Sequence, residues 1–385
     1  MRASIQPARY AHGSKRLDCH LAGREILEAL ANTPNNGFLA ERDKLPLRIY
    51  KMTILSSSGT ALSHALSTIL PTPEDTLLLR ACLTPGESGK LACEAWLKQH
   101  QNGFKKEAIK AFLPLFLHAV KKHAVKVDAA FLTVLRTAVL REELRTNTYN
   151  RICCELFSAL SDYVIPTIVL GGAALADTVY AHPALRHSHD IDVLIPDVEF
   201  SRTERLIASL RFKSVNLPEA GSQHWEFKHA SGLPLQLHSR LFQLSSYTPP
   251  LTEIWSRSHN LLNAGVPVRT LSPVDSLLYV CGHASYSSSR HSLRWVSDGW
   301  FIIDGYPDLD WDLLLDCAGR SRLALPLSVM LGYLAEDLSA PIPSECLGAL
   351  SATAANSHAM ERQTLGGTSA VCEGSLKESF RRATN

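Results

Sequence analysis

The fold is decided by residues 168–195, which read IVLGGAALADTVYAHPALRHSHDIDVLI. A short β-branched and apolar run ends at Gly171-Gly172, and this pattern predicts a buried strand that feeds a tight turn. Residues Ala173–Tyr180 have the spacing of a helix, and Asp190–Ile195 alternates as a second strand. The stretch therefore predicts a strand, a glycine turn, a helix and a second strand in immediate succession.

Two acidic residues begin the second predicted strand. Asp190 and Asp192 are two positions apart, so both carboxylates point to the same side of the strand. Such a pair suits Mg²⁺, which prefers one or two carboxylates together with water and phosphate oxygens. An isolated D-x-D is more often a pair of solvent-exposed acids at a strand end. The evidence for a metal site therefore depends on the residues around the pair.

The glycine pair supplies that context. Gly171 and Gly172 end a strand and open a helix, so backbone N–H groups could approach a phosphate closely, favoured by the helix N-terminus. A glycine pair taken alone more often simply makes a turn. The order strand, Gly-Gly, helix and strand with D-x-D is much more specific than either half.

This arrangement resembles the nucleotidyltransferase superfamily of the polymerase-β type and, within it, the family of uncharacterised nucleotidyltransferases. The matching residues are Val169–Leu175, Tyr180, Arg186 and Asp190–Ile195, and the flanking helical regions are similar too. The resemblance implies that Gly171 and Gly172 bind the triphosphate of a nucleotide, and that Asp190 and Asp192 bind Mg²⁺. It also places Arg186 where it can contact a phosphate.

The sequence departs from the family pattern at two positions. Members often carry Lys where Gly171 stands, so one phosphate contact is missing. The third carboxylate of the superfamily precedes a Leu-His pair, and the residue there is Gln236, which can coordinate only weakly and cannot act as a general base. We keep Gln236 among the candidate catalytic residues, beside Asp190 and Asp192.

Two other residues are candidates for the role of the missing acid. With a two-residue turn at Ser231-Gly232, Phe227 faces Gln236 and Glu226 points to the opposite side of the sheet, whereas a turn longer by one residue reverses this. His238 shares the face of Gln236 and could serve as a base, although a polar residue at the edge of the core is the commoner case.

The rest of the chain predicts a mostly helical α+β protein with a small mixed-sheet nucleotidyltransferase core. Within the flanks we predict separate helices at Asp128–Glu143 and Asn147–Tyr163, and a helical pattern that resumes after Pro250. His283 and Asp298 are interpreted as hydrogen-bonding partners in helix packing. The predicted units are a poorly ordered extension (1–51), a helical subdomain (52–163), the core (164–245), a second helical subdomain (246–340) and a weakly ordered tail (341–385).

Composition narrows the class of protein. The chain has 385 residues and a formal charge of +2, so charge alone does not indicate a nucleic-acid partner. The nine cysteines are scattered without C-x-x-C spacing and indicate reduced thiols. No apolar run predicts a membrane span, so we expect a cytoplasmic protein without a membrane partner. We also expect Met52, which precedes the first clear pattern, to be the natural start.

Three functions are compatible with these observations. The first is Mg²⁺-dependent transfer of a nucleoside monophosphate from an NTP, with ATP as the expected donor, to a hydroxyl of a protein, a metabolite or RNA. The second is a catalytically impaired nucleotide-binding or scaffold protein, because Gln236 replaces the third carboxylate. The third is a helical interaction module with a vestigial core. The sequence does not indicate the acceptor or the oligomeric state.

Overall fold

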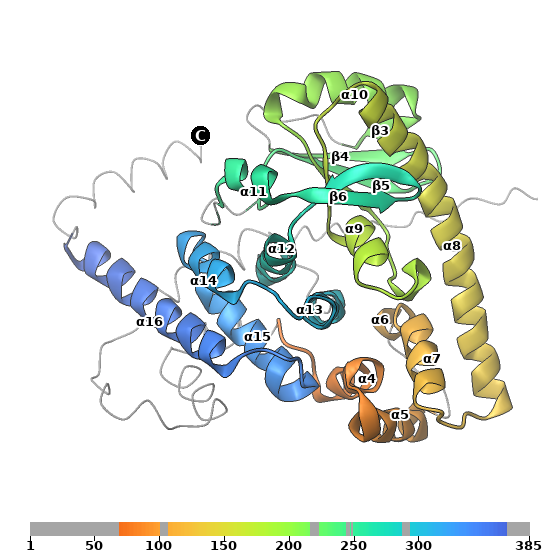
Figure 1. Cartoon of the computed structure of the whole chain (residues 1–385). Helices are drawn as coiled ribbons and strands as arrows, with labels where there is room; N and C mark the ends of the chain where they lie inside the picture. Colours follow the sequence, from red (N-terminus) through yellow and green to blue (C-terminus); the bar gives the residue numbers. More distant parts are fainter. Residues whose placement is uncertain are drawn as a thin grey trace, which may run out of the picture.

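The computed structural model describes residues 69–100, 107–215, 223–243, 247, 249–286 and 293–367. These residues form an α+β structure in which helices surround one seven-stranded mixed sheet (Figure 1). The expectations for residues 1–51 and for Met52 lie outside the described part of the chain. No helix in the described ranges is both long and apolar enough to cross a membrane.

The sheet has the order β3-β4-β5-β2-β1-β7-β6. Strands β2 and β5 are parallel, as are β1 and β7, and the other neighbouring pairs are antiparallel. Strand β2, which contains Asp192 and follows Asp190 directly, is therefore near the middle of the sheet. The strands are β1 (Ile168–Leu170), β2 (Ile191–Leu194), β3 (Phe212–Ser214), β4 (His224–His229), β5 (Pro234–His238), β6 (His259–Asn263) and β7 (Val266–Thr270).

Helices precede, interrupt and follow these strands. The N-terminal group lies at one end of the molecule and the C-terminal group packs beside it, both below the sheet in Figure 1. The helices are α4 (Pro73–Leu83), α5 (Gly86–His100), α6 (Glu107–Lys110), α7 (Leu113–Lys122), α8 (Ala129–Asp162), α9 (Gly171–Thr178), α10 (Phe200–Ser209), α11 (Leu251–Arg257), α12 (Pro273–Tyr286), α13 (Arg294–Gly305), α14 (Trp311–Arg320), α15 (Ala324–Leu338) and α16 (Ser344–Gly367).

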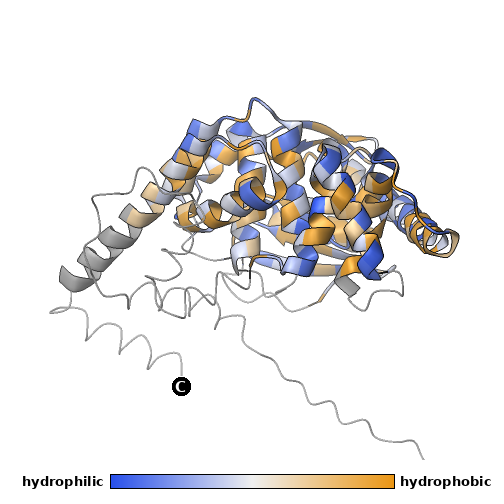
Figure 2. Ribbon diagram, turned by 90° about the horizontal axis from the view of Figure 1, so that it is seen from below, coloured by the Kyte–Doolittle hydropathy of each residue, from blue (hydrophilic) through white to orange (hydrophobic). Residues whose placement is uncertain are grey.

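The two faces of the sheet belong to different hydrophobic clusters. Alternate residues of β2, β4 and β5 pack with the C-terminal half of α8 and with α10 on one face. The other face packs against α12 and joins the larger cluster that unites the N- and C-terminal helices. The helices consequently carry both hydrophobic and hydrophilic stripes, which Figure 2 shows from below. The aspartate side chains belong to the face that meets α12.

Helix α8 corrects the prediction of two separate helices between Asp128 and Tyr163. It is one helix of 34 residues, so it is about 51 Å long at 1.5 Å per residue. The side chain of Asp128 caps its start by accepting from the backbone N–H of Phe131 (2.9 Å). The sequence of α8 contains neither Gly nor Pro. The Thr and Asn residues between the two predicted helices have low helix propensity, but they do not end a helix that is stabilised by packing at both ends.

The hairpin of β6 and β7 corrects the prediction that only helices follow Pro250. Its turn consists of Ala264 and Gly265, whose φ angles are 48° and 82°. Two successive positive φ angles are the signature of the turn that matches strand twist in a two-residue hairpin. The hairpin pairs with β1 through β7, so it extends the sheet on the side of the glycine turn.

Helix α16 covers Ser344–Gly367 of the predicted weakly ordered tail (341–385), and the prediction for residues 368–385 lies outside the described part of the chain. Cys346, Leu347 and Leu350 are buried in the large cluster. The sequence pattern is weak since these residues share the helix with many Ala and Ser residues, which contrast little in polarity. Packing against α14 and α15 stabilises α16 as a helix.

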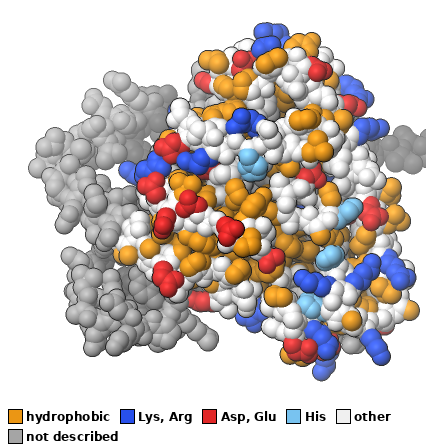
Figure 3. Space-filling view, in the orientation of Figure 1, with side chains coloured by type: hydrophobic (Ala, Val, Ile, Leu, Met, Phe, Trp, Pro, Cys, Tyr) orange, Lys and Arg blue, Asp and Glu red, His pale blue; other side chains and the backbone are white. Residues whose placement is uncertain are grey.

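Charged side chains are mixed over the face of the molecule in Figure 3. Acidic groups gather on the left of this face, and Lys and Arg gather at the lower right, where the N-terminal helices lie in Figure 1. The small net charge is thus a sum of local patches of opposite sign.

The packing of α16 can be tested by comparing two Leu→Ala variants of the full chain. Leu350 is 0% exposed, so Leu350→Ala should lower the free energy of unfolding by about 2–4 kcal/mol. Leu91 is 56% exposed, and Leu91→Ala should change stability by less than about 0.5 kcal/mol. Urea unfolding followed by circular dichroism measures both, and equal effects would contradict the packed position of α16.

Candidate functional site

The glycine turn lies directly beside Asp192. Gly171 has a φ of +49°, and a Cβ atom at this position would be 3.3 Å from Cε1 of Tyr279 and 3.7 Å from Oδ2 of Asp192. The left-handed φ favours glycine at this position, since L side chains are strained in this conformation. The structure therefore brings together the glycine turn at the end of β1 and the acid at the start of β2.

Gly172 is required for a different reason. A Cβ atom at Gly172 would lie 2.1 Å from Nη1 of Arg186, which is far closer than two such atoms can approach. The guanidinium of Arg186 is thus packed against the backbone at the start of α9. Gly172 therefore allows the guanidinium of Arg186 to pack against the backbone. Its role in binding a phosphate stays a prediction.

Arg186 is held by Asp298 of α13. Its Nε and Nη2 donate to the two carboxylate oxygens of Asp298, each at 2.8 Å, and its Nη1 donates to Oγ of Ser188 at 2.9 Å. Tyr180 donates to the same carboxylate at 2.7 Å. The interpretation of Asp298 as a helix-packing hydrogen-bond partner is confirmed. The predicted phosphate contact of Arg186 is not tested, but all three of its nitrogens already have partners in the described structure.

Asp192 is hydrogen-bonded from the neighbouring parallel strand. Nε2 of His238 donates to Oδ1 of Asp192 (3.1 Å), and Nδ1 of His238 lies 2.6 Å from Nδ1 of His224. Burial acts to raise the pKa of the Asp192 carboxyl, but the hydrogen bond from His238 and the surrounding histidines hold it below its ordinary value. Asp192 therefore carries its negative charge at neutral pH. His283 of α12 is one of these histidines.

Asp190 has the opposite electrostatic character. Burial, and then the charge of Asp192, raise the pKa of Asp190 from 3.8 to about 6. Nε2 of His189 lies 3.5 Å from Oδ2 of Asp190. Asp192 thus raises the pKa of Asp190, from two positions along the same stretch of chain. A cation placed between them would relieve this repulsion.

The loop before β2 is held from α8. Arg145 donates to the carbonyl oxygen of Ser188 (2.7 Å), and the hydroxyl of Tyr149 donates to the carbonyl oxygen of Asp190 (2.8 Å). These contacts fix the backbone that carries the first aspartate. They connect residues about 40 positions apart and have no local sequence signal.

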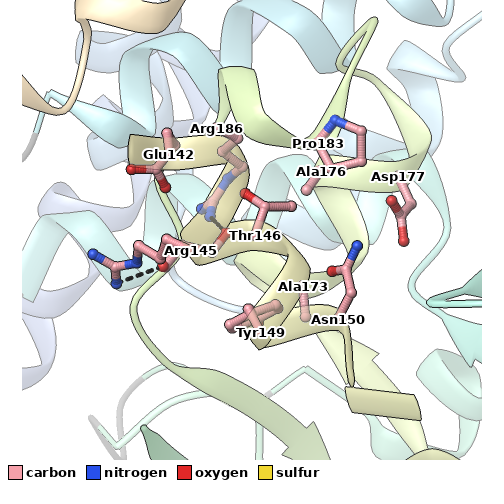
Figure 4. Close-up of a pocket in the computed structure, with 11 residues that line it drawn as sticks. Glu142, Arg145, Thr146, Tyr149, Asn150, Ala173, Ala176, Asp177, Pro183 and Arg186 are labelled. Atoms are coloured by element: carbon pink, nitrogen blue, oxygen red, sulfur yellow. Dashed lines mark hydrogen bonds between the residues drawn. The ribbon is translucent and has the colours of Figure 1, made fainter. Parts of the chain in front are cut away.

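A small pocket lies between α8, α9 and this loop (Figure 4). Arg186 and Ser188 line it on one side, and Tyr149, Asn150 and Asp177 contribute from the two helices. Burial raises the pKa of Asp177, and Asn263 of β6 donates to its carboxylate (2.8 Å). The pocket borders the elements that support the aspartate loop.

The register of the hairpin β4–β5 corrects the sequence prediction. Gln236 pairs with Glu226, not with Phe227, because the connection spans more than the two residues Ser231 and Gly232. Gln236 also pairs with Asp192 of β2. Asp192, Gln236 and Glu226 are therefore level with one another on three neighbouring strands and on the same face. This is the alternative register that the sequence predicts for a turn longer by one residue.

Arg294 is a residue of the site that the sequence did not indicate. It begins α13, and its Nη1 contacts Nδ1 of His189. Burial lowers the pKa of Arg294, as does the charge of Arg186, whereas Asp190, Asp298 and Asp192 act to raise it. It lies more than 90 positions after the aspartates, so only the packing of α13 brings it to them.

A divalent cation fits this arrangement as a partly solvated ion. Two neighbouring carboxylates and a turn of backbone N–H groups match the preference of Mg²⁺ for a few carboxylates with water and phosphate oxygens. Within the described ranges no cluster of three or more His, Cys, Asp or Glu side chains forms a complete metal site. Asp190 and Asp192 would hold such an ion only in part, leaving positions for a phosphate ligand.

A strand, a glycine turn, a helix and a paired-aspartate strand in a mixed sheet define the class of nucleotidyltransferase-type proteins. The model of the family described as uncharacterised nucleotidyltransferases matches residues 110–338, more than half of the chain, and the protein belongs to this family. The resemblance inferred from the sequence is thereby confirmed. Nucleotidyl transfer is the chemistry of this class. No curated protein matches the sequence.

Solved structures give distant likenesses. A solution structure of the antibiotic-resistance factor ANT(2'')-Ia is 15% identical with a TM-score of 0.34, covering 46% of this chain and 95% of that one. A crystal structure of ANT(2'')-Ia in complex with adenylyl-2''-tobramycin is 15% identical with a TM-score of 0.35, covering 46% and 97%. An antigenic nucleotidyltransferase-like protein from Paracoccidioides brasiliensis is 17% identical with a TM-score of 0.32, covering 51% and 95%. The family assignment rests on the family model.

The raised pKa of Asp190 predicts a pH-dependent effect of Asp190→Asn on the metal-free protein. A charged Asp190 costs free energy, so the native state loses stability as the pH rises from about 4 through 6. In chelator at pH 7, Asp190→Asn should be more stable than the wild type by about 1–3 kcal/mol, and the difference should vanish below pH 4. Urea unfolding at several pH values measures this.

The control for Asp190→Asn is Asp162→Asn, which removes one negative charge from an exposed position at the end of α8. It should leave stability within about 0.5 kcal/mol at each pH. A constant difference between Asp190→Asn and the wild type from pH 4 to pH 7 would contradict the electrostatic strain assigned to Asp190.

Proposed function

We propose that the protein transfers a nucleoside monophosphate from an NTP to an acceptor hydroxyl, with Mg²⁺ bound by Asp190 and Asp192. The observation that carries this proposal is the position of Asp192 beside the Gly171 turn, where a Cβ atom added to Gly171 would lie 3.7 Å from Oδ2 of Asp192. Mg²⁺ would neutralise the charge that develops on the transferred phosphoryl group. ATP is the donor to test first, and a cytoplasmic location is part of the proposal.

The backbone around Gly171 and Gly172 would orient the triphosphate at the N-terminus of α9. The acceptor oxygen attacks the α-phosphorus, a new P–O bond forms, and the bond to the departing pyrophosphate breaks. Asp192 enters this reaction ionised because His238 lowers the pKa of its carboxyl. The contribution of the protein is then mainly positioning and electrostatics.

The proton of the acceptor hydroxyl needs a destination. Gln236 is level with Asp192 but cannot accept a proton. Glu226 pairs with Gln236 on the same face, one strand farther out, so its backbone is about 10 Å from that of Asp192 at the usual strand spacing. This is too far for a shared metal with Asp192 but suits an acid that receives the proton directly or through one water. Glu226 is the proposed base.

The second candidate function is nucleotide binding without transfer. It is favoured by Gln236 itself, because the position level with Asp192 carries no charge. In that case Mg²⁺-dependent nucleotide binding persists while no pyrophosphate is released with any acceptor. Pyrophosphate release in the presence of candidate protein, metabolite and RNA acceptors distinguishes the two functions.

The metal site is tested by Asp192→Asn, which keeps the shape of the side chain and an acceptor for His238. Loss of the ionised carboxylate should weaken Mg²⁺-dependent ATP binding by at least about tenfold, measured by calorimetry, while the melting temperature changes little. Asp197→Asn, an exposed acid just after β2, is the matched control and should bind as the wild type does. Equal ATP affinity and metal dependence for Asp192→Asn and the wild type would overturn the proposal.

The role of Gln236 is tested by Gln236→Glu, which would place a third carboxylate level with Asp192. The variant should bind Mn²⁺ several-fold, about 1 kcal/mol, more tightly than the wild type. It should be less stable in chelator because the three charges repel, so the melting temperature should depend more on the metal. Electron paramagnetic resonance of free Mn²⁺ and thermal melts measure these effects.

The control is Asn260→Asp, which adds one negative charge at an exposed position of β6, near the far edge of the same sheet. It should leave both Mn²⁺ affinity and the metal dependence of melting unchanged. If Gln236→Glu behaves like Asn260→Asp, Gln236 does not take part in the metal site.

A further inference from the structure

The sheet face that carries Asp192 is exposed on the two outer strands beyond β5. Glu226 and Lys228 share this face on β4, because they are two positions apart on a strand, and both are exposed. Lys213 of β3 pairs directly with Lys228, so it lies on the same face, and it is exposed too. The row of Asp192, Gln236 and Glu226 therefore borders an open surface that carries two lysines.

The two lysines are directly opposite each other on antiparallel strands. Like charges in this position destabilise a sheet, because cross-strand neighbours are only about 5 Å apart at Cβ. Among the described residues, the side chains of Lys213 and Lys228 have no ion pair or hydrogen bond. Cε of Lys228 lies towards the hairpin turn, 3.9 Å from where a Cβ atom of Gly232 would be. The fold thus places two positive charges side by side without a protein counter-ion in this part of the chain.

Protection of the sheet edge accounts for only one of these lysines. Strand β3 is at the edge, and edge strands often carry lysine, which opposes pairing with another chain. Lys213 fits that role. Lys228 is on β4, which has a neighbouring strand on each side, and its position opposite Lys213 costs stability. The pair is therefore better suited to binding an anion than to stabilising the sheet.

The lysine pair is on the side of β2 away from the glycine turn. In the strand order, β1 with the Gly171 turn is on one side of β2, and β5, β4 and β3 are on the other. At about 4.8 Å per strand, Lys228 is about 14 Å from β1 and Lys213 about 19 Å. Glu226, the proposed base, is only two residues from Lys228, or about 7 Å along β4. The lysines are thus placed to meet the acceptor and not the triphosphate of the donor.

We propose that Lys213 and Lys228 bind a terminal phosphate group of the acceptor, which is a small phosphorylated molecule with a free hydroxyl. This inference rests on the proposed function. A phosphate monoester carries close to two negative charges at neutral pH, which two ammonium groups match. With its phosphate on the lysines, the acceptor directs the hydroxyl towards Glu226 and the metal. The hydroxyl oxygen attacks the α-phosphorus of the NTP, its proton passes to Glu226, pyrophosphate departs, and the phosphate of the acceptor is unchanged.

The side chains of this face favour a small acceptor over a nucleic acid. Sheets that bind single-stranded nucleic acids expose aromatic side chains on which the bases stack. The Phe and Trp residues of β3, β4 and β5 are Phe212, Trp225 and Phe227, and all three are buried in the cluster on the opposite face. A polynucleotide would therefore find two phosphate contacts here but no stacking surface on these strands.

Ribose 5-phosphate and ribose are matched probes, because they differ only in the phosphate group. Each is titrated by calorimetry into the full chain saturated with Mg²⁺ and a non-hydrolysable ATP analogue, so that the donor site is filled. The wild type should bind ribose 5-phosphate at least about tenfold more tightly than ribose, because the lysines make charge-assisted contacts to phosphate. This preference should disappear when Lys213→Gln and Lys228→Gln are combined, whereas Lys213→Arg with Lys228→Arg should keep most of it.

The matched control combines Lys121→Gln with Lys122→Gln, which removes two exposed lysines at the end of α7, outside the sheet. It should keep the preference of the wild type. Thermal melts show whether each variant is folded. Replacing Lys213 and Lys228 by Gln should not lower the melting temperature, because opposed like charges are removed.

Four outcomes would overturn the inference. The first is that the Gln variant at Lys213 and Lys228 keeps the preference for ribose 5-phosphate. The second is that the wild type binds the Mg²⁺-nucleotide but does not distinguish ribose 5-phosphate from ribose, in which case the proposed function stands. The third is tighter, lysine-dependent binding of an oligoribonucleotide without a terminal phosphate, which would assign the lysines to a nucleic-acid backbone. The fourth is that the wild type does not bind ATP with Mg²⁺, because the proposed function then fails and this inference fails with it.

Discussion

The buried ion pair between Arg186 and Asp298 is the interaction on which the site depends. It joins the loop before β2 to helix α13, and the close contact of Arg186 with Gly172 extends the connection to the start of α9. Removing one partner of such a pair typically costs about 3–5 kcal/mol, because the other charge stays buried. The glycine turn, the aspartate loop and the C-terminal helices are therefore positioned together, and the pair holds Arg294 near Asp190.

The two aspartates are alike in sequence but different in electrostatic state. Asp192 is hydrogen-bonded by His238 and keeps its charge, whereas burial and the charge of Asp192 raise the pKa of Asp190 to about 6. Asp192 thus keeps its charge readily, whereas charging Asp190 costs free energy. Such strain at a polar site is typical of groups arranged for a ligand and not for stability.

Asp192, Gln236 and Glu226 form a row across three neighbouring strands. The middle position of this row is uncharged, and the second acid lies one strand farther away. Because the register of β4 and β5 sets this row, the proposed roles of Gln236 and Glu226 depend on tertiary structure.

The sequence alone determined the local elements of the core and its class of protein. The β-branched run before Gly171, the alternation through Asp192 and the order of the motifs are local patterns, and the family assignment confirms the class they indicated. Which residues meet Asp192 was decided by tertiary structure. The hairpin register depended on one residue of loop length, β6 and β7 formed at the edge of the sheet, and α16 folded against apolar partners. Arg186 binds Asp298, and Arg294 contacts His189 beside Asp190, across more than 90 positions, because these contacts form only when helices pack and no local pattern encodes them.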